Sequence, residues 1–533
     1  METRTVFVAD PISKEALEVL KKEPSIRVDA RPGLPLPEKL EAVSQAAGLI
    51  VRSETKVDEP FLKACQRLEI VVRAGVGVDN IDLAAATRKG VVVQNIPDGN
   101  VRSAAEHSVA MLLALARNLP QGHASMKAGK WERSKLVGVE VLGKTLAVVG
   151  LGKIGRYVVR MSLGLGMKVI GHDPFVAPGV AEELGIELVG SLDAALSRAD
   201  FATVHVPLSK ETRGMIGRDV LARAKPGLRL VNCARGGVVD EAALLEAIEK
   251  GFVAGAAVDV FEKEPPGLTP LVEHPKVIVT PHLGASTREA QENVAIAAAA
   301  QIVDYFRTGK LTNPVNAVSI PPEVQDRFMP YRELIHRLGI LQAQLLEGNP
   351  ARVAVRFYGD IFESKIQAYL TSMALCGFLK NRSTQPVNVI NARNMAAEMG
   401  LAVEESHEGR SRYFHNMIKI QVEDSAGRRE VGGTIRGQKG LRVVLLDDYQ
   451  FDAVLEGRIL IAANRDRPGM IGVFGNVLGS HQINISYMSL GRDRTGGTAI
   501  ALINLDDPVP PAALKDLRDN DGILWAKVVE LPE

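Results

Sequence analysis

The chain has 533 residues, a length that predicts three or four domains of roughly 100–200 residues each. Its 46% hydrophobic content, 24% charge and formal net charge of +1, without a basic stripe, exclude a typical nucleic-acid-binding protein. The longest apolar run, near 108–116, is far shorter than the ~20 residues that span a bilayer, and residues 1–10 are no signal peptide. The three cysteines lack metal-ligand spacing and fit a reducing cytosol, so we expect a cytoplasmic protein without a metal or a membrane partner.

Residues 1–98 alternate short apolar runs with helical patterns. The apolar runs are at 6–9, 48–51, 70–72 and 91–94, and the helical patterns between them include 13–22 and 82–89. This alternation predicts a small parallel α/β unit.

Residues 99–283 repeat the alternation on a larger scale. A helix is predicted over 101–117, and strands are predicted at 145–149, 168–171, 201–205, 228–232, 255–260 and 277–280. The pattern predicts a doubly wound sheet whose ligand edge lies at the carboxyl ends of its strands. A long alanine-rich helix follows over 286–308.

A glycine-rich turn follows the first of these strands, in the segment TLAVVGLGKIG at 145–155. Gly150 permits the tight turn, Gly152 lets the backbone approach a pyrophosphate, and Gly155 allows close packing of the next helix on the strand. The amino end of that helix offers unpaired N–H groups to phosphates. Asp173 ends the next strand, where its carboxylate suits ribose hydroxyls and repels the extra phosphate of NADP. The sequence therefore predicts an NAD site.

Three further residues follow predicted strands at the ligand edge. Arg235 is placed to bind a carboxylate through two parallel hydrogen bonds, and the alternative is an exposed arginine in a turn. His282 suits proton transfer near neutral pH, although a single histidine there also fits a structural role. A carboxylate beside it would fix its tautomer, but spacing alone does not choose between Glu262 and Glu264.

The second half of the chain contains two more units. Prolines and asparagines at 313–316 and 320–322 predict a linker, and residues from about 323 to 455 read as helix first and strands later, with a turn at 432–437. Residues 457–533 read as strand, helix, strand, strand, helix, strand, the order of a ferredoxin-like module.

Several segments of the first 316 residues resemble the D-isomer-specific 2-hydroxyacid dehydrogenases. They are RAGVGVDN at 73–80, the glycine turn with Asp173, NCARGG at 232–237, DVFEKEP at 259–265 and PHLGAS at 281–286. By position, the resemblance implies Arg235, Glu264 and His282 as the catalytic set and so chooses Glu264 over Glu262. It further implies these cofactor contacts: Lys153, Ile154, Val206, Pro207, Cys233, Ala234, Asp259 and Gly284. For Cys233, a small buried hydrophobic role is equally expected, and we assign it no chemistry.

The resemblance also implies the domain order. A Rossmann nucleotide domain (99–283) is inserted in a split flavodoxin-like substrate domain (1–98 and 284–316). An α+β intervening domain (317–455) and a ferredoxin-like ACT domain (456–533) then follow. The middle unit resembles the intervening domain of a long bacterial branch of this family, and ANRDRPGM at 463–470 with Asn484 resembles an ACT effector site in which Asp466 and Asn484 hold an amino acid at a subunit interface. The alternative is a dimerisation module without a ligand.

This combination implies oxidation of 3-phospho-D-glycerate to 3-phosphooxypyruvate, the first step of L-serine biosynthesis, with L-serine as feedback effector and a homodimer or homotetramer as the assembly. A phosphorylated substrate needs further cations, and Arg52 and Arg73 beside Gly75 lie at strand ends, while Arg133 is expected to reach a partner subunit. Each arginine also fits a solvated surface role. A glyoxylate or hydroxypyruvate reductase would share every catalytic residue, and a non-enzymatic NAD-sensing scaffold is a further alternative.

Overall fold

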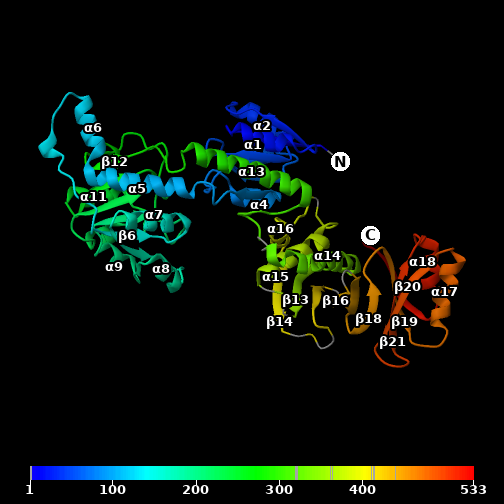
Figure 1. Ribbon diagram of the computed structural model, residues 1–533. Helices are drawn as coiled ribbons and strands as arrows, with labels where there is room; N and C mark the ends of the chain where they lie inside the picture. The colour runs from blue at the N-terminus through cyan, green and yellow to red at the C-terminus, as the bar shows by residue number, and fades with distance from the viewer. Residues whose placement is uncertain are drawn as a thin grey trace.

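The computed structural model describes residues 3–318 and 322–532, except 360–361, 363, 384, 410, 412–413, 426 and 438–439. The described residues form four sheets, each in a lobe of its own. The lobes lie in a row, with lobe 2 at one end, then lobe 1, lobe 3 and lobe 4, which are numbered here in chain order (Figure 1). No helix of the described chain is both long and apolar enough to cross a membrane.

Lobe 1 is a parallel sheet with the order β2-β1-β3-β4-β5. Its strands are β1 (Arg4–Val8), β2 (Ile26–Ala30), β3 (Gly48–Val51), β4 (Ile70–Arg73) and β5 (Val92–Asn95), and its helices are α1 (Lys14–Lys21), α2 (Leu36–Ser44), α3 (Glu59–Ala64) and α4 (Leu83–Lys89). The later helix α13 (Arg288–Thr308) also packs here, because Val294, Ala298 and Ile302 share one buried cluster with Val6 and Val72.

Lobe 2 is a parallel sheet with the order β12-β11-β10-β9-β6-β7-β8. Its strands are β6 (Thr145–Val149), β7 (Lys168–His172), β8 (Glu187–Leu188), β9 (Phe201–Val204), β10 (Leu228–Asn232), β11 (Val253–Val258) and β12 (Val277–Val279). Helices α5 (Val101–Arg117) and α7 (Lys153–Gly164) cover one face, and α9 (Leu192–Leu196), α10 (Arg218–Ala222), α11 (Glu241–Glu249) and α12 (Pro270–Glu273) cover the other. The strand order reverses between β6 and β9, which is where ligands bind in such sheets.

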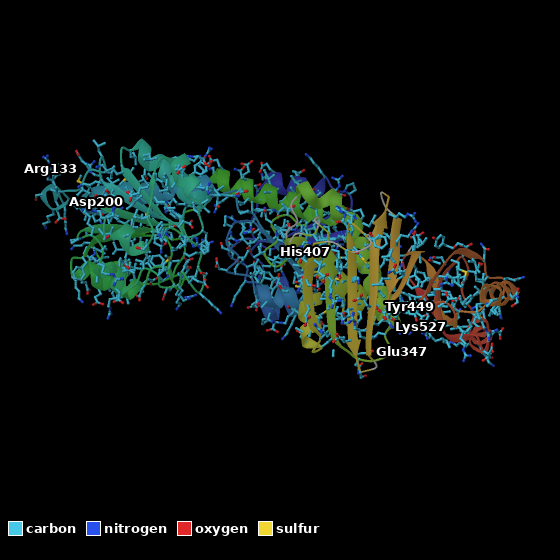
Figure 2. All side chains as sticks on the ribbon, turned by 90° about the horizontal axis from the view of Figure 1, so that it is seen from below. Arg133, Asp200, Glu347, His407, Tyr449 and Lys527 are labelled. Atoms are coloured by element: carbon cyan, nitrogen blue, oxygen red, sulfur yellow. The ribbon has the colours of Figure 1, made fainter. Side chains whose placement is uncertain are left out.

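Lobe 3 is a six-stranded mixed sheet, in the order β14-β13-β15-β16-β17-β18, covered by the helices that precede most of its strands. The elements are α14 (Pro322–Leu345), β13 (Pro350–Tyr358), α15 (Ser364–Leu379), α16 (Ala392–Glu398), β14 (Ala402–Glu408), β15 (Met417–Asp424), β16 (Gly427–Arg436), β17 (Gly440–Leu446) and β18 (Tyr449–Val454). Figure 2, which views the molecule from below, shows the strands of this sheet side by side. The predicted turn at 432–437 is wrong, since Gly432 and Gly433 lie inside β16. A Cβ on Gly433 would meet Leu334 and Leu338 of α14 at 2.9 Å, so Gly433 lets the helix approach the strand.

Lobe 4 is an antiparallel sheet with the order β20-β21-β19-β22. Its elements are β19 (Arg458–Arg465), α17 (Met470–Ser480), β20 (Ile485–Arg492), β21 (Thr498–Leu505), α18 (Pro511–Arg518) and β22 (Ile523–Glu530), which confirms the predicted βαββαβ order. One sheet face packs on α17 and α18, and the other packs on lobe 3.

The predicted linker has two parts with different outcomes. Residues 313–316 lie against β5, where Val315 N donates to Val93 O at 2.7 Å and the Asn316 side chain accepts from Val93 N at 2.8 Å. Residues 320 and 321 lie outside the described residues, and α14 begins at Pro322. The first part is therefore an ordered extra segment at the edge of lobe 1.

Candidate active site

The glycine loop after β6 has the geometry that a bound pyrophosphate requires. Gly150 has a φ of +95°, and a Cβ there would lie 2.7 Å from His205 O. A Cβ on Gly155 would lie 2.0 Å from Gly150 O, so only glycine fits where α7 crosses the strand end. Gly152 has no atom within 4 Å of such a Cβ, and α7 begins there without a side-chain cap. The N–H groups at the start of α7, where Lys153 is the first helical residue, therefore face open space in which a phosphate could bind.

Asp173 follows β7 and supports this loop. Its two oxygens accept hydrogen bonds from Leu151 N at 2.8 Å and Phe175 N at 2.9 Å. The carboxylate thereby holds the glycine loop while it remains partly exposed at the ligand edge. Lys153 also reaches lobe 1, where its ammonium group pairs with Asp98.

His282 and Glu264 form a hydrogen-bonded pair at the carboxyl end of the sheet. Nδ1 of His282 lies 2.8 Å from one Glu264 oxygen, and the other Glu264 oxygen accepts from Phe261 N at 3.1 Å. Burial acts to raise the pKa of Glu264, but the hydrogen bonds from His282 and Phe261 outweigh it and hold the pKa below its usual value. An ionised Glu264 orients the ring and leaves Nε2 as the atom that exchanges a proton. A pocket of about 360 Å³ adjoins the pair, lined also by Phe261, Pro265, Pro266, Val272, Val279, Thr280 and Pro281.

Buried Asp259 fixes the backbone around His282. Its carboxylate accepts from Thr280 Oγ1 at 2.5 Å, Leu283 N at 2.7 Å and Gly284 N at 2.9 Å, and lies 3.2 Å from His107 Nε2. Gly284, a predicted cofactor contact, therefore donates its N–H to Asp259 and does not have it available for the cofactor. Sequence analysis did not single out His107 or Thr280. Thr280 directly precedes the Pro-His motif, but His107, in the middle of α5, carries no sequence signal.

Three arginines from lobes 1 and 2 lie near one another where the two lobes meet. Arg52 follows β3, Arg73 ends β4, and Arg235 follows β10. Arg235 Nε lies 3.4 Å from Asp79, which belongs to lobe 1, and the Arg235 guanidinium lies against Gly77. The Arg235–Asp79 pair therefore joins the two lobes, and sequence analysis did not single out Asp79 although the RAGVGVDN motif contains it.

Arg73 shows the electrostatic effect of this cluster. Burial, together with the charges of Arg235 and Arg52, lowers the pKa of Arg73 to about 10, and Asp79 opposes this shift. The guanidinium lies directly over Gly75, where a Cβ would fall 1.6 Å from Nη1. The Nε of Arg73 is buried without a hydrogen-bond partner. Clustered guanidinium groups and a buried N–H donor without a protein partner favour the binding of an anion.

The remaining predicted cofactor contacts lie along the same edge. A Cβ on Gly150 would lie 2.9 Å from the Val206 side chain, so Val206 and exposed Pro207 adjoin the glycine turn. Ala234 lies in the turn that carries Arg235, and its N–H donates to Asn232 at 3.1 Å. Ile154 is half-buried in the first turn of α7.

Cys233 is a buried thiol between β10 and α5. Burial and the charge of Asp259 raise the pKa of Cys233 to about 12, so the group stays a thiol at neutral pH. Its sulfur lies within 4.8 Å of ligand atoms of His107 and Asp259. A protonated thiol and a carboxylate already bound to several donors form a hydrogen-bonded cluster, which does not favour a metal.

Arg133 lies apart from all of these residues. It begins the short helix η1 (Arg133–Lys135) after α6 (Leu119–Lys127), in an arm that projects from lobe 2 (Figure 1). Figure 2 places Arg133 at the outer end of the molecule. The arm exposes Trp131 (79%) and Val137 (80%).

The predicted effector residues lie in different parts of lobe 4. Asp466 accepts from Gly496 N at 3.0 Å and lines a cavity of about 360 Å³ with Arg467, Gly469 and Arg492. Asn484 instead donates to Asp506 at 2.6 Å, before β20, and is not among the residues that line this cavity. One chain therefore does not bring the two residues together.

Comparison with known proteins places this geometry in a family. Residues 109–284 match the NAD binding domain of D-isomer specific 2-hydroxyacid dehydrogenases, residues 327–447 match the D-3-phosphoglycerate dehydrogenase intervening domain, and residues 458–522 match an ACT domain. D-3-phosphoglycerate dehydrogenase from Archaeoglobus fulgidus is 40% identical over 529 residues, which cover 99% of this chain and 100% of that protein. The chain belongs to the D-3-phosphoglycerate dehydrogenase family. This confirms the predicted family, the mixed α/β fold and the NAD cofactor of an NAD-dependent oxidoreductase.

Solved structures share the fold over part of the chain. A glyoxylate reductase from Paecilomyes thermophila is 27% identical with a TM-score of 0.54 and covers 59% of this chain and 99% of its own. The NAD+-bound 3-phosphoglycerate dehydrogenase of Entamoeba histolytica is 29% identical with a TM-score of 0.50, again covering 59% and 99%. Enzymes with different substrates thus share this fold, and this chain adds the regions that match the intervening and ACT domains.

Proposed function

We propose that the chain oxidises 3-phospho-D-glycerate to 3-phosphooxypyruvate, the first step of L-serine biosynthesis. The observation that carries the proposal is the cluster of Arg52, Arg73 and Arg235, in which the turn of Arg235 contacts the loop that carries Glu264, the partner of His282. A carboxylate and a phosphate on one small substrate need cations at two points, and this cluster offers them from both lobes. The full-length similarity to D-3-phosphoglycerate dehydrogenases supports the same substrate.

The proposed chemistry follows from the geometry. Arg235 binds the substrate carboxylate and orients the C2 oxygen, and Arg52 with Arg73 binds the phosphate. His282 Nε2 removes the hydroxyl proton, while Glu264 holds Nδ1 and stabilises the imidazolium that forms. Bound NAD supplies the hydride acceptor. We propose that Gly150, Gly152, Lys153, Ile154 and Gly155 hold its pyrophosphate, that Asp173 holds the ribose, and that the other predicted contacts flank its two rings.

The substrate test compares turnover of phosphorylated and plain 2-hydroxy acids. We expect NADH to form with 3-phosphoglycerate and NAD, and to form far more slowly with D-glycerate, D-lactate or glycolate. Arg73→Ala is expected to raise the KM for 3-phosphoglycerate by at least about tenfold, because a charged hydrogen bond contributes about 1.5–3 kcal/mol. Preferred reduction of glyoxylate or hydroxypyruvate would instead assign the reductase alternative, and NAD binding without any turnover would assign the scaffold.

We also propose a regulated homo-oligomer in the cytosol. The exposed apolar arm around Trp131 supports a subunit contact that delivers Arg133 to a partner's cleft. The separation of Asp466 from Asn484 within one chain supports an L-serine site shared between two ACT domains, and the unpaired cysteines suit a reducing compartment. The proposed domains are 1–98 with 284–316, 99–283, 317–455 and 456–533.

Two measurements test these points. Light scattering is expected to give a dimer or tetramer, and a monomer with full activity would reject the role of Arg133. Titration with L-serine is expected to inhibit the wild type and to inhibit Asp466→Ala far less at unchanged basal turnover. Equal inhibition of both proteins would contradict the proposed effector site.

A further inference from the structure

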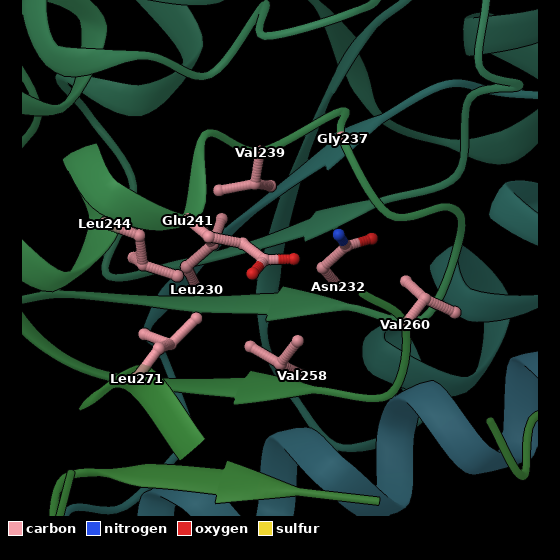
Figure 3. A pocket seen from close by; sticks show the side chains of 9 residues that line it. All are labelled: Leu230, Asn232, Gly237, Val239, Glu241, Leu244, Val258, Val260 and Leu271. Carbon is pink, nitrogen blue, oxygen red and sulfur yellow. The ribbon is translucent and has the colours of Figure 1, made fainter. Parts of the chain in front are cut away.

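Glu241 is a half-buried carboxylate in lobe 2 that the proposed chemistry does not use. It is the first residue of α11, whose N-cap is Asp240, since the Asp240 side chain accepts from Ala243 N at 2.9 Å. The cap therefore does not need Glu241, and its side chain turns toward the sheet. Figure 3 shows its carboxylate among Leu230, Val239 and Val258, on the side of Asn232. The cavity that these residues line is only about 10 Å³, so the carboxylate is closely surrounded.

The carboxylate binds the loop that carries Glu264. Its Oε1 accepts a hydrogen bond from Glu262 N at 2.7 Å, and Glu262 lies two residues before Glu264. The preceding N–H group, that of Phe261, donates to Glu264 itself at 3.1 Å. Two consecutive N–H groups of this loop are thus held by carboxylates, one from α11 and one from the residue that orients His282.

The same peptide group touches the turn of Arg235. A Cβ on Gly236 would lie 1.9 Å from Phe261 O and 2.6 Å from Glu262 N, so the two backbones are in direct contact. A shift of the Phe261–Glu262 peptide would therefore disturb Arg235 and Glu264 together.

Stability does not explain a charge at this position. Burial raises the pKa of Glu241 above its usual value, the hydrogen bond from Glu262 opposes this, and the charges of Glu262 and Asp240 add to it. Because the folded pKa lies above the unfolded one, the ionised group destabilises the fold at neutral pH. A neutral acceptor of the same shape would make the same hydrogen bond without that cost.

We propose that Glu241 is a positioning residue for hydride transfer, which holds the Phe261–Glu262 peptide so that Glu264 stays bonded to His282. The proposal deepens the proposed function and rests on it for the roles of Glu264 and His282. Glu241 touches neither substrate nor cofactor, and it acts through the loop alone.

The test uses two neutral variants that differ in the hydrogen-bond acceptor. Glu241→Gln keeps an acceptor oxygen and is expected to retain turnover within about threefold. Glu241→Met fills the apolar cavity without an acceptor and is expected to lower kcat by up to about 100-fold, since small misplacement of catalytic groups has effects of that size. Glu249→Ala, an exposed residue of the same helix, serves as the control and is expected to match the wild type.

A double-mutant cycle separates positioning from a structural role. In a Glu264→Ala background, Glu241→Met is expected to lower kcat no further, because the bond that it supports is already gone. In Glu241→Met and in Glu264→Ala, the low-pH limb of the kcat/KM profile is expected to move in the same direction. The Kd for NADH is expected to stay unchanged in both. Additive losses, or equal loss in the Gln and Met variants, would overturn the proposal. All rates are ratios to the wild type with whichever 2-hydroxy acid it oxidises, so a wrong substrate assignment leaves the result interpretable.

Discussion

The two halves of this molecule bury their apolar surface in different ways. Among the described residues, no buried apolar cluster joins lobe 1 to lobe 2, and the polar pairs Arg235–Asp79 and Lys153–Asp98 connect these two lobes. In lobes 3 and 4, one buried cluster runs from Leu334 in α14 to Leu531 after β22. Polar contacts between lobes allow relative motion, whereas a shared core resists it. Lobes 1 and 2, which carry the proposed active site and are called the catalytic half below, are therefore expected to move relative to each other more easily than lobes 3 and 4, which form one block.

Hydrogen bonds reinforce the block where lobe 3 meets lobe 4. Gln344 of α14 donates to Glu530 O at 2.7 Å and accepts from Glu530 N at 3.1 Å, so it satisfies both backbone groups of an edge-strand residue. Asn504 in β21 donates to Val454 O at 3.0 Å. The ACT sheet is therefore attached to the intervening domain along an edge as well as a face.

The largest expected effect concerns the catalytic half alone. His282→Ala is expected to lower kcat by about two to four orders of magnitude, because it removes the group that takes the proton. Binding of NAD and the unfolding of lobes 3 and 4 should not change. Near-native turnover, measured as NADH formation with NAD bound, would reject His282 as the base.

The next effect tests the shared core. Ile461 in β19 is fully buried against lobe 3, and Ile461→Ala is expected to destabilise the block by about 2–5 kcal/mol. Lobes 3 and 4 should still unfold in one transition, followed by Trp525 fluorescence in a Trp131→Phe background. Ile503→Ala, which faces α17 and α18, is the matched control. Separate unfolding transitions for the two lobes would contradict a shared core of lobes 3 and 4.

Acid should weaken the catalytic half through Asp259. Burial acts to raise the pKa of Asp259, but hydrogen bonds from His107, Thr280 and Leu283 outweigh it and hold the pKa below its usual 3.8. Because the folded pKa is the lower one, ionised Asp259 stabilises the fold above pH 3.8, and this stability is lost as the pH falls through the folded pKa. The Tm difference between the wild type and Asp259→Asn should shrink there, and a constant difference would contradict this.

The smallest expected effect concerns the contact between the halves. Asn388 in lobe 3 donates to Gly90 O at 2.7 Å, at the end of α4, and Ile390 joins the core of lobe 1. Asn388→Ala is expected to leave basal turnover unchanged and to weaken L-serine inhibition by several-fold, in keeping with coupling energies of about 1–3 kcal/mol. Unchanged inhibition would show that the signal does not pass through this contact. Arg393→Ala on α16, away from lobe 1, serves as the control.

Some site residues could be predicted because their signal is local. The glycine loop depends on a strand, a turn and a helix that are adjacent in sequence, and its glycines lie where the backbone requires them. The local pattern does not choose between Glu262 and Glu264 as the partner of His282, because the two residues lie at nearly the same distance from it in the sequence. The structure brings Glu264 to His282, while Glu262 gives its N–H to Glu241, since the loop turns between them.

Other residues could not be predicted because their partners are distant in sequence. Asp79 of lobe 1 pairs with Arg235 of lobe 2. His107 reaches Asp259 from α5, which covers one face of the lobe 2 sheet. The turn predicted at 432–437 failed for the same reason. Glycines are typical of turns, and only the packing of α14 on Gly433 and of Met417 and Leu445 on Gly432 shows why both lie inside a strand.

The sequence by itself determined most strands and helices of lobes 1 and 2, although not β2 or β8, together with the cofactor loop and the family, because periodicity and turn chemistry act over a few residues. Only the tertiary structure decided that Asp79 pairs with Arg235, that His107 reaches Asp259 and which lobes share a core. Those outcomes depend on packing between segments that are distant in sequence, for which no local pattern carries the information.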